Sequence, residues 1–414
     1  MNDKQKTNGQ DNVNYYKVRR SVFVAGFVVV FMCAAMSAFS VYAEDFVSIT
    51  GASRSSVNLT LTIYQLVMAI SGIFAGRIVD KKGARGLTLV GGLFYGIGLI
   101  IATYSHSLWQ LYLGIGVIAG IGNGMQYNPV LNTALRWFPD KRGTISGLLL
   151  TAASLGPFLV TFAGTTFGLK GLAYVGILYI ILSIICSFFM KKKPEDWLPE
   201  GYVPIVDKDD TEIAYKPNEM LKTGRFWLYI LIFGIGASAG LMMISSLSSI
   251  AQTQLQKSAA FGASMVNVNS VANLAGRLIA GKACDKFGEK KTLAAILLIN
   301  MLSLIALAYA YSTVGFIIAL IFLGASFGAV LVAFPPLTTK TFGEKYSGSN
   351  YSLMFFGYAL GSLIGPQLSS TFANYDAGIK TYKPSLIIAS ILALVGFILV
   401  LLVIFKDRTK EEVK

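Results

Sequence analysis

The sequence contains few charged residues, few cysteines and almost no histidine. Of its 414 residues only 14% are charged and 54% are hydrophobic. Soluble domains carry roughly 25% charged residues, so this composition excludes a soluble enzyme, a secreted disulfide-bonded protein and a disordered chain. Cys33, Cys186 and Cys284 show no paired spacing, and His106 is the single histidine. We therefore expect neither a disulfide framework nor a metal site, and no cofactor.

Long apolar runs make up most of the chain. A transmembrane helix needs about 20 consecutive apolar residues, and twelve such stretches can be delimited. They are near-continuous rather than alternating, which argues against an outer-membrane β-barrel. We predict an all-α membrane protein with twelve transmembrane helices in two pseudo-symmetric six-helix bundles. The predicted helices cover residues 21–42, 57–79, 87–105, 108–135, 143–169, 171–190, 226–250, 260–281, 292–311, 314–339, 347–372 and 386–405.

A polar stretch separates the first six segments from the last six. It carries the longest charged loop of the chain and divides two halves of similar size. The predicted organisation is a cytoplasmic N-terminal tail (1–20), a first bundle (21–190), a cytoplasmic linker (191–223), a second bundle (224–405) and a cytoplasmic tail (406–414).

The net charge of +14 is distributed unevenly between the loops. With the N-terminus in the cytoplasm, 29 of the 35 lysines and arginines lie on the inner side, 5 on the outer side, and Arg277 on neither. This asymmetry is typical of membrane proteins, whose cytoplasmic loops are enriched in Lys and Arg. It predicts a multi-pass protein of the cytoplasmic membrane with both termini inside. The basic charge then reflects orientation in the lipid bilayer, and we expect no nucleic-acid partner.

The two halves repeat a short motif at matching places. The loop GRIVDKKGAR begins at Gly76, after the second segment, and recurs as GKACDKFGEK from Gly281, at an offset of 205 residues. The run FPDK from Phe138 is echoed by FGEK from Phe342, at an offset of 204. Such agreement indicates an internally duplicated six-helix unit, the plan of transporters whose halves rock against each other.

The repeated loop has a mechanical interpretation. Glycine lets a helix end approach its neighbour, and the acidic and basic side chains form a charge network that holds one side of a carrier closed. The alternative is a solvated tight turn that only satisfies the charge asymmetry. The candidate gating residues are Gly76, Asp80, Lys81, Arg85, Gly281, Asp285, Lys286, Arg136, Asp140 and Arg142.

Arg277 is the candidate for substrate binding. It precedes Asp285 by eight residues, which places it roughly 12 Å inside the membrane edge. An arginine at that depth costs about 2.5–3.5 kcal/mol on insertion scales, and a carboxylate substrate would offset this cost through a bidentate pair. Asn273 and Asn269 extend the same helix face. The alternative is a structural arginine bonded to backbone carbonyls or reaching the interface.

The motifs resemble those of a known family. The doubled loop is similar to the signature of the major facilitator superfamily. The run RWFPDKRG from Arg136, with NTA before it and SG after it, resembles the oxalate:formate antiporter family, which is close to the monocarboxylate porters. The resemblance extends over essentially the whole chain. It implies a twelve-helix carrier that works by alternating access, with a substrate-binding arginine at the position of Arg277.

The resemblance also indicates where this sequence departs from the family. Oxalate carriers of the family place a second cation, a lysine, seven residues after the tyrosine that corresponds to Tyr351. Tyr358 occupies that place here. One cation with a phenol suits a monoanion such as formate, lactate or pyruvate better than oxalate. The family also has a tyrosine at Tyr127 and an aromatic wall that corresponds to Phe327.

Two glutamines complete the candidate substrate site. Gln126 and Gln65 lie in the fourth and second segments beside other polar residues. The alternative for each, and for Tyr127, is a polar side chain that bonds to a neighbouring helix.

The combined prediction is a monomeric carrier of a small carboxylate. The segments contain no Asp or Glu near their middle, which favours anion exchange over proton coupling. A proton-coupled monocarboxylate symporter and an exporter of drugs or amphiphilic compounds remain alternatives, and a ligand sensor is a third. An enzyme is not expected, because no nucleophile–base pair or phosphate-binding loop is present.

Overall fold

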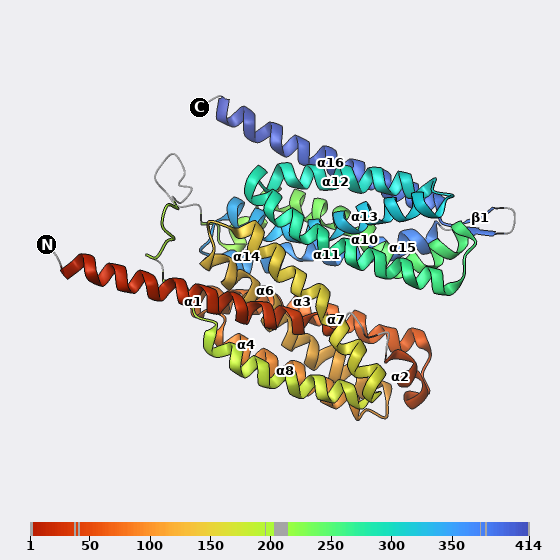
Figure 1. Ribbon diagram of the computed structural model, residues 1–414, viewed down its shortest axis with the longest axis horizontal. Helices are drawn as coiled ribbons and strands as arrows, with labels where there is room; N and C mark the ends of the chain where they lie inside the picture. Colours follow the sequence, from red (N-terminus) through yellow and green to blue (C-terminus); the bar gives the residue numbers. More distant parts are fainter. Residues whose placement is uncertain are drawn as a thin grey trace. The chain divides into compact units, whose positions relative to one another are not determined.

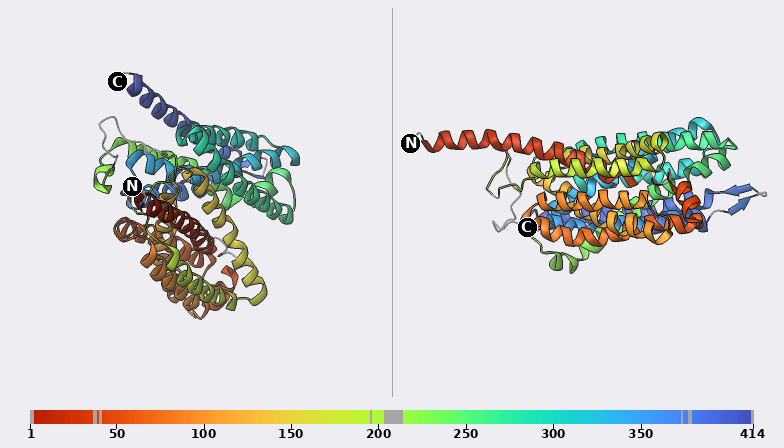
Figure 2. Two further views of the ribbon diagram at one scale, coloured as in Figure 1. Left: turned by 60° about the vertical axis from the view of Figure 1, so that its left-hand side comes forward. Right: turned by 90° about the horizontal axis from the view of Figure 1, so that it is seen from below.

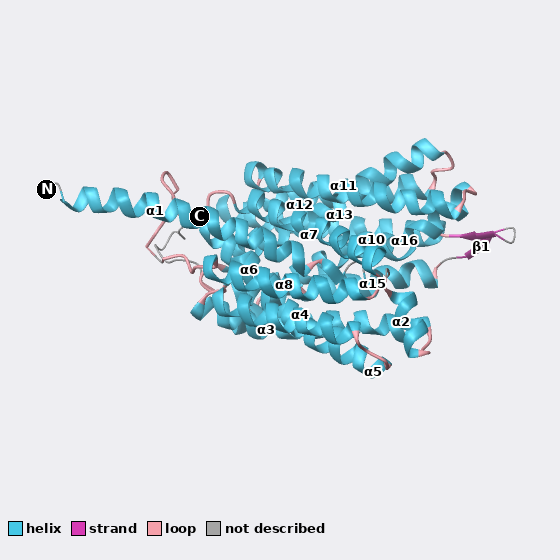
Figure 3. Ribbon diagram, turned by 60° about the horizontal axis from the view of Figure 1, so that its bottom comes forward, coloured by secondary structure: helices cyan, strands magenta, loops and turns pink. Residues whose placement is uncertain are grey.

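The structure is a computed structural model of the chain, and it describes residues 3–36, 39, 42–194, 196–202, 214–372, 374–376 and 379–412. The described elements are helices, apart from one antiparallel pair of short strands (Figures 1 and 3). The middle of the predicted linker (203–213), the first two residues of the predicted N-terminal tail (1–2) and the last two of the C-terminal tail (413–414) lie outside the described residues.

The chain divides into two compact units, each made mainly of one half of the sequence. Unit 1 comprises Met1–Ile145, Leu149–Tyr215 and Phe342–Leu353. The helices that begin in it are α1 (Asp3–Cys33), α2 (Ala43–Thr50), α3 (Arg54–Lys82), α4 (Arg85–Thr103), α5 (Leu108–Leu111), the π-helix η2 (Tyr112–Ala119), α6 (Gly120–Trp137), α7 (Arg142–Phe167), α8 (Lys170–Phe189) and α14 (Ser347–Met354).

Unit 2 comprises Ser146–Leu148, Lys216–Thr341 and Met354–Lys414. Each unit therefore includes a short segment from the other half of the sequence: three residues of α7 belong to unit 2, and nearly all of α14 belongs to unit 1. The prediction of two separate bundles did not contain this exchange. The elements of unit 2 are α9 (Pro217–Leu221), α10 (Gly224–Leu255), α11 (Ala259–Phe287), α12 (Glu289–Ala308), α13 (Thr313–Phe342), α15 (Phe356–Thr371), β1 (Asn374–Asp376), β2 (Ile379–Thr381) and α16 (Lys383–Glu412).

Nine helices in the described part of the chain are long and apolar enough to cross a membrane. Three predicted segments are absent from this set for separate reasons. The predicted 21–42 helix ends at Cys33, the 260–281 helix (α11) is rich in polar residues, and the 347–372 helix is interrupted at Phe355. The nine spans are Leu59–Lys82, Arg85–Thr103, Leu108–Trp137, Arg142–Phe167, Lys170–Phe189, Gly224–Leu255, Glu289–Ala308, Thr313–Phe342 and Lys383–Asp407.

The predicted N-terminal tail is helical. α1 begins at Asp3, far ahead of the predicted start at residue 21, and its first turns extend beyond the other helices of unit 1 (Figure 2). Tyr15 and Tyr16 of α1 pack against Trp197, in the segment after α8. The polar composition of residues 1–20 therefore does not prevent helix formation; it only excludes that part of α1 from a membrane span.

Large apolar side chains lie on the buried faces and also on the exposed faces of the helices. In unit 2, Met242, Leu304 and Leu320 belong to one buried cluster that joins α10, α12 and α13. Other apolar side chains, such as Phe162 and Leu402, are more than half exposed. Exposed apolar surface on this scale is what a bilayer covers.

Glycine permits close contact between helices inside unit 1. A Cβ atom added to Gly96 of α4 would lie 2.5 Å from the carbonyl oxygen of Gly176 in α8. The two backbones are therefore in direct contact. This small-residue packing is typical of membrane helices, which lack a hydrophobic driving force for association.

Candidate functional site

Three polar side chains lie along one face of α11. Asn269, Asn273 and Arg277 follow one another at four-residue intervals, which brings them onto one helix face. All three are buried, and Arg277 is only 9% exposed. α11 begins where the hydroxyl of Ser258 accepts a hydrogen bond from the backbone N–H of Phe261. The predicted polar face of this helix is thus formed inside unit 2.

The stem of Arg277 is held against α13. A Cβ atom on Gly328 would collide with the carbonyl oxygen of Asn273 and would lie 3.1 Å from Cγ of Arg277. Ala325 of α13 is in comparable backbone contact with Gly276. Because the helices meet without intervening side chains, the position of the Arg277 stem is fixed by backbone rather than by mobile groups.

A short piece of α7 also packs against α11. A Cβ atom on Gly147 would lie 2.6 Å from the carbonyl oxygen of Arg277 and 3.3 Å from Cα of Gly281. Next to it, the hydroxyl of Ser146 donates to the carbonyl oxygen of Val332, at 3.1 Å. These contacts explain why residues 146–148 belong to unit 2. They also give Gly281 a packing role.

An aromatic cluster stands beside the cation. Arg277 interacts electrostatically with the hydroxyl of Tyr358. The Tyr358 ring stacks on Phe355, with centroids 5.1 Å apart, and its centroid is 6.3 Å from that of Phe233. Phe233 in turn stacks on Phe334 at 3.9 Å. One buried cation next to a phenol and an aromatic wall can bind a small organic anion.

Two further side chains extend this region. Phe327 of α13 is buried, and its ring occupies the space that a side chain on Gly240 would fill. The Oδ1 atom of Asn269 is buried and has no hydrogen-bond partner among the described residues. Buried amide oxygens are normally bonded. Phe327 thus lies against α10, and Asn269 retains an unused acceptor on the Arg277 face.

In unit 1, the candidate gating residue Asp80 lies at the start of α14. Its carboxylate accepts hydrogen bonds from the backbone N–H groups of Gly348 (3.0 Å) and Ser349 (2.9 Å) and from the Ser349 hydroxyl (2.6 Å). It also forms an ion pair with Arg136. A carboxylate at a helix N-terminus satisfies N–H groups that have no partner within the helix and interacts favourably with the helix dipole.

We call the arrangement of Asp80, Arg136 and the first turn of α14 the α14 latch. Further contacts hold it together. Arg136 donates through Nε to the hydroxyl of Ser347 at 3.0 Å. A Cβ atom on Gly76 would lie only 2.8 Å from the carbonyl oxygen of Gly348. Gly76 is therefore the residue that allows α3 to approach α14.

Three more ion pairs lie within unit 1. Glu344 pairs with Arg142 and lies 3.2 Å from Nζ of Lys193. Asp140 pairs with Arg19, whose guanidinium also stands 4.0 Å from the centre of the Phe138 ring. The predicted charged residues Asp140 and Arg142 thus each form an ion pair within unit 1.

The remaining candidate gating residues lie on the surface. Lys81 and Lys286 are exposed, and so is Asp285 near the end of α11. The guanidinium of Arg85 stands 5.3 Å from the centre of the Phe188 ring.

The polar candidates of unit 1 have separate environments. Gln126 is fully buried, and its amide bonds to the hydroxyl of Tyr179, to the carbonyl of Thr88 and to the hydroxyl of Ser183. These contacts match the alternative of a side chain bonded between helices. They occupy the amide group of Gln126, so the proposed substrate site does not include this residue. The structure places Gln65 on the exposed side of α3.

Tyr127 is half-buried on α6 and interacts with Tyr351 of α14. Its part in substrate binding stays a prediction.

Some residues of these clusters were not predicted from the sequence. Ser347, Ser349 and Glu344 supply partners to the predicted cations and to Asp80. The echo of FPDK in FGEK pointed to the loop that contains Glu344. No sequence pattern identified Arg19 or Lys193, because their partners are far away along the chain.

Comparisons with known proteins agree with this architecture. The model of the Major Facilitator Superfamily matches residues 23–366 and 230–414. The crystal structure of the transporter FucP in the outward conformation aligns with a TM-score of 0.68 at 17% identity, over 91% of this chain and 97% of FucP. The fold is that of a multi-pass membrane transporter. The chain belongs to the major facilitator superfamily.

Two curated relatives cover most of the chain. The oxalate:formate antiporter of Oxalobacter formigenes is 28% identical over 377 residues, which span 88% of this chain and 86% of the antiporter. YhjX, an uncharacterized MFS-type transporter of Escherichia coli (strain K12), is 26% identical over 356 residues, or 84% of this chain and 87% of YhjX. The superfamily predicted from the doubled loop is confirmed, and the predicted family is represented among the relatives.

Proposed function

We propose that this transporter carries a small monocarboxylate across the cytoplasmic membrane by alternating access, with Arg277 as the group that binds the carboxylate. The observation that carries the proposal is the burial of Arg277 on the same face of α11 as Asn273, together with its electrostatic interaction with the hydroxyl of Tyr358. A relative named for two carboxylates, oxalate and formate, supports the same substrate class.

The charge of Arg277 favours an anion over a neutral substrate. A buried arginine in a membrane helix is costly, by about 2.5–3.5 kcal/mol on insertion scales. A carboxylate offsets that cost through two parallel charge-assisted N–H···O bonds. A neutral compound brings no charge to compensate the guanidinium. Asn273, one turn earlier on α11, would donate a further hydrogen bond from its amide.

Tyr358 favours one negative charge over two. Its hydroxyl interacts electrostatically with Arg277. Tyr358 occupies the position where the resemblance to oxalate carriers leads us to expect a lysine. A phenol donates a hydrogen bond but supplies no charge. A dianion such as oxalate would then face one cation only. Formate, lactate and pyruvate each carry one negative charge, which one cation balances.

We further propose that transport is an exchange of anions and that the α14 latch closes the cytoplasmic side. Proton-coupled carriers usually have a titratable group on the substrate path, and the predicted spans contain no Asp or Glu near their middle. Asp80 would release α14 when the carrier opens inward. The excess of Lys and Arg in one set of loops supports an orientation with both termini in the cytoplasm.

The experiment is counterflow with the purified chain in proteoliposomes. Vesicles are preloaded with unlabelled formate, lactate, pyruvate, oxalate or, as a control, sulfate, and uptake of the labelled counterpart is followed with and without a pH gradient. We expect at least one monocarboxylate to enter only when a carboxylate is inside, faster than oxalate, and at a rate that does not depend on the gradient.

Two outcomes would contradict the proposal. Uptake into unloaded vesicles that follows an inward proton gradient would identify a symporter. A lack of carboxylate movement, together with export of amphiphilic dyes, would assign the chain to the drug exporters of the same fold.

A further inference from the structure

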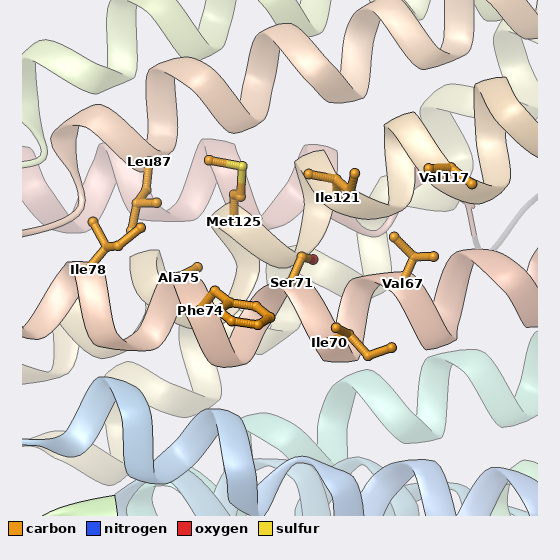
Figure 4. A pocket seen from close by; sticks show the side chains of 10 residues that line it. All are labelled: Val67, Ile70, Ser71, Phe74, Ala75, Ile78, Leu87, Val117, Ile121 and Met125. Carbon is orange, nitrogen blue, oxygen red and sulfur yellow. The ribbon is translucent and has the colours of Figure 1, made fainter.

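Unit 1 contains an apolar groove between α3 and the continuous helix formed by η2 and α6. Its volume is about 490 Å³. Ile70, Phe74 and Ile78 line it from α3, and Ile121 and Met125 line it from α6 (Figure 4). Phe74 is 61% exposed, so the groove opens outward from the unit.

The groove offers nothing that would bind a polar ligand. The only polar side chain in its lining is Ser71, whose hydroxyl already donates to the carbonyl oxygen of Met68 at 3.2 Å. A sugar or a free carboxylate in the groove would lose its bonds to water and gain none. The interior therefore suits a hydrocarbon chain.

Cations stand at one end of this groove. Lys81 and Lys82 follow Ile78 by three and four residues, so they continue the Ile78 face of α3 by one turn. Arg85 precedes Leu87, which lines the same end of the groove. Lys81 and Lys82 are exposed and form no ion pair within the part of the chain that the structure describes.

The acidic residue nearest in the chain does not neutralise these cations. The carboxylate of Asp80 is engaged by Arg136 and by the first turn of α14. The end of the groove thus has a net positive charge beside a hydrocarbon-lined channel.

The repeat in unit 2 does not preserve this arrangement. At the offset of 205 residues, Phe287 replaces Lys82 and Lys290 replaces Arg85. Lys290 is held in an ion pair with Asp407. The duplication therefore retains the loop and one exposed cation, Lys286 in place of Lys81, but not the exposed cations Lys82 and Arg85. This difference indicates that Lys82 and Arg85 serve something other than the shared loop structure.

We propose that this groove binds an anionic membrane phospholipid. One acyl chain lies along Ile70, Phe74 and Ile121, and the phosphate of the headgroup pairs with Lys81, Lys82 and Arg85. The bound lipid sits on α3, the helix that carries Asp80, so the lipid composition of the membrane acts directly on the helix of the α14 latch. Each buried methylene and each basic residue adds to the affinity.

The test is lipid retention by the purified full chain in detergent, measured by native mass spectrometry. The probes are phosphatidylglycerol and phosphatidylcholine with identical acyl chains, added in equal amounts. The wild type is expected to retain phosphatidylglycerol preferentially. Replacing Lys81 and Lys82 together by Gln should reduce this preference by roughly fivefold for each charge removed. The control replaces Lys286 and Lys291, from the equivalent turn of unit 2, and should change nothing.

A second pair of variants tests the groove itself. Ile70→Trp fills the groove and should reduce retention of phosphatidylglycerol severalfold. Ile181→Trp is the control, because Ile181 of α8 is as exposed as Ile70, at 49%, and lies outside the groove. Glycerol phosphate, which has the headgroup chemistry without chains, should not displace the lipid.

Hydrogen exchange of the wild type provides a readout without any substitution. Added phosphatidylglycerol should slow exchange in the α3–α4 turn (82–86) and leave the corresponding turn (287–291) unaffected. Equal retention of the two lipids, an unchanged preference in the folded Lys81/Lys82 variant, or equal effects of Ile70→Trp and Ile181→Trp would overturn the proposal.

Discussion

Arg277 is both charged and buried, and other polar residues surround it. Its helix, α11, is too polar to be included among the nine apolar spans. Asn269 and Asn273 share its face, and Gly328 of α13 leaves space for its stem. A membrane helix that gives up hydrophobicity along one face loses insertion energy. A ligand that binds this face would offset that cost most simply.

Tyr358 should determine whether the carrier accepts one negative charge or two. Tyr358→Lys places a second cation beside Arg277, so a second charge-assisted bond to a dianion becomes available. We expect oxalate counterflow to rise about tenfold, the size of one such bond, and monocarboxylate exchange to fall because the cations repel each other when a monoanion is bound.

Tyr358→Phe is the matched control for this change. It keeps the ring that stacks on Phe355 and removes only the hydroxyl. This variant should lose monocarboxylate exchange severalfold and gain no oxalate transport. Oxalate counterflow at the wild-type level in a folded Tyr358→Lys protein would contradict the proposed basis of selectivity.

Gln126 shows what the sequence could not decide. A glutamine in a membrane helix predicts a bonded group, but not whether the partner is a substrate or another helix. Here the partners are Tyr179, Thr88 and Ser183, which come from two other helices of unit 1. Only the rotation of α6 within the bundle distinguishes the two cases. That rotation depends on packing, which periodicity alone does not specify.

The helices were predicted well where they are apolar and poorly where they are interrupted. The segments from 87–105 to 171–190 and from 292–311 to 314–339 correspond closely to observed helices. The interruption at Phe355 has no Gly or Pro at that residue to signal it. The backbone N–H groups of Tyr358 and Ala359 both bond to the carbonyl of Phe355, so the new helix starts with a tightened turn.

The first turn of α14 depends on a carboxylate from α3. Asp80→Asn keeps the shape of the side chain but removes the charge that pairs with Arg136 and that the N–H groups of Gly348 and Ser349 contact. Hydrogen bonds to a charged group are worth about 1.5–3 kcal/mol. We therefore expect the amides of Gly348 and Ser349 to exchange with deuterium about tenfold faster or more, as measured by mass spectrometry in detergent.

The control for this prediction is Asp196→Asn, which removes an exposed carboxylate outside the latch. It should leave exchange in α14 unchanged. If Asp80→Asn also leaves these amides as protected as in the wild type, then Asp80 does not hold α14, and the latch has no role in closing the carrier.

The internal duplication was the strongest signal of the fold in the sequence. A motif repeated at an offset of 205 residues predicted two six-helix halves, and the superfamily match confirms that class of carrier. The compact units nevertheless exchange two short segments, residues 146–148 and 342–353. A repeat in sequence specifies which helices correspond. It does not specify which neighbours each of these segments contacts, because the contacts join residues that are far apart in the sequence, such as Ser146 with Val332 and Ser349 with Asp80.

The central claim is that the charge of Arg277 binds the transported anion. The most direct measurement is carboxylate counterflow by the wild type, Arg277→Gln and Arg277→Lys in proteoliposomes. The control is Arg225→Gln, because Arg225 forms a partly exposed ion pair with Asp407 in the same unit.

We predict that Arg277→Gln reduces exchange by about a hundredfold or more, because truncating a buried charge pair costs about 3–5 kcal/mol. Arg277→Lys should keep part of the activity, since it retains the charge but not the bidentate geometry, and Arg225→Gln should match the wild type. A folded Arg277→Gln protein that exchanges carboxylates at the wild-type rate would contradict the account.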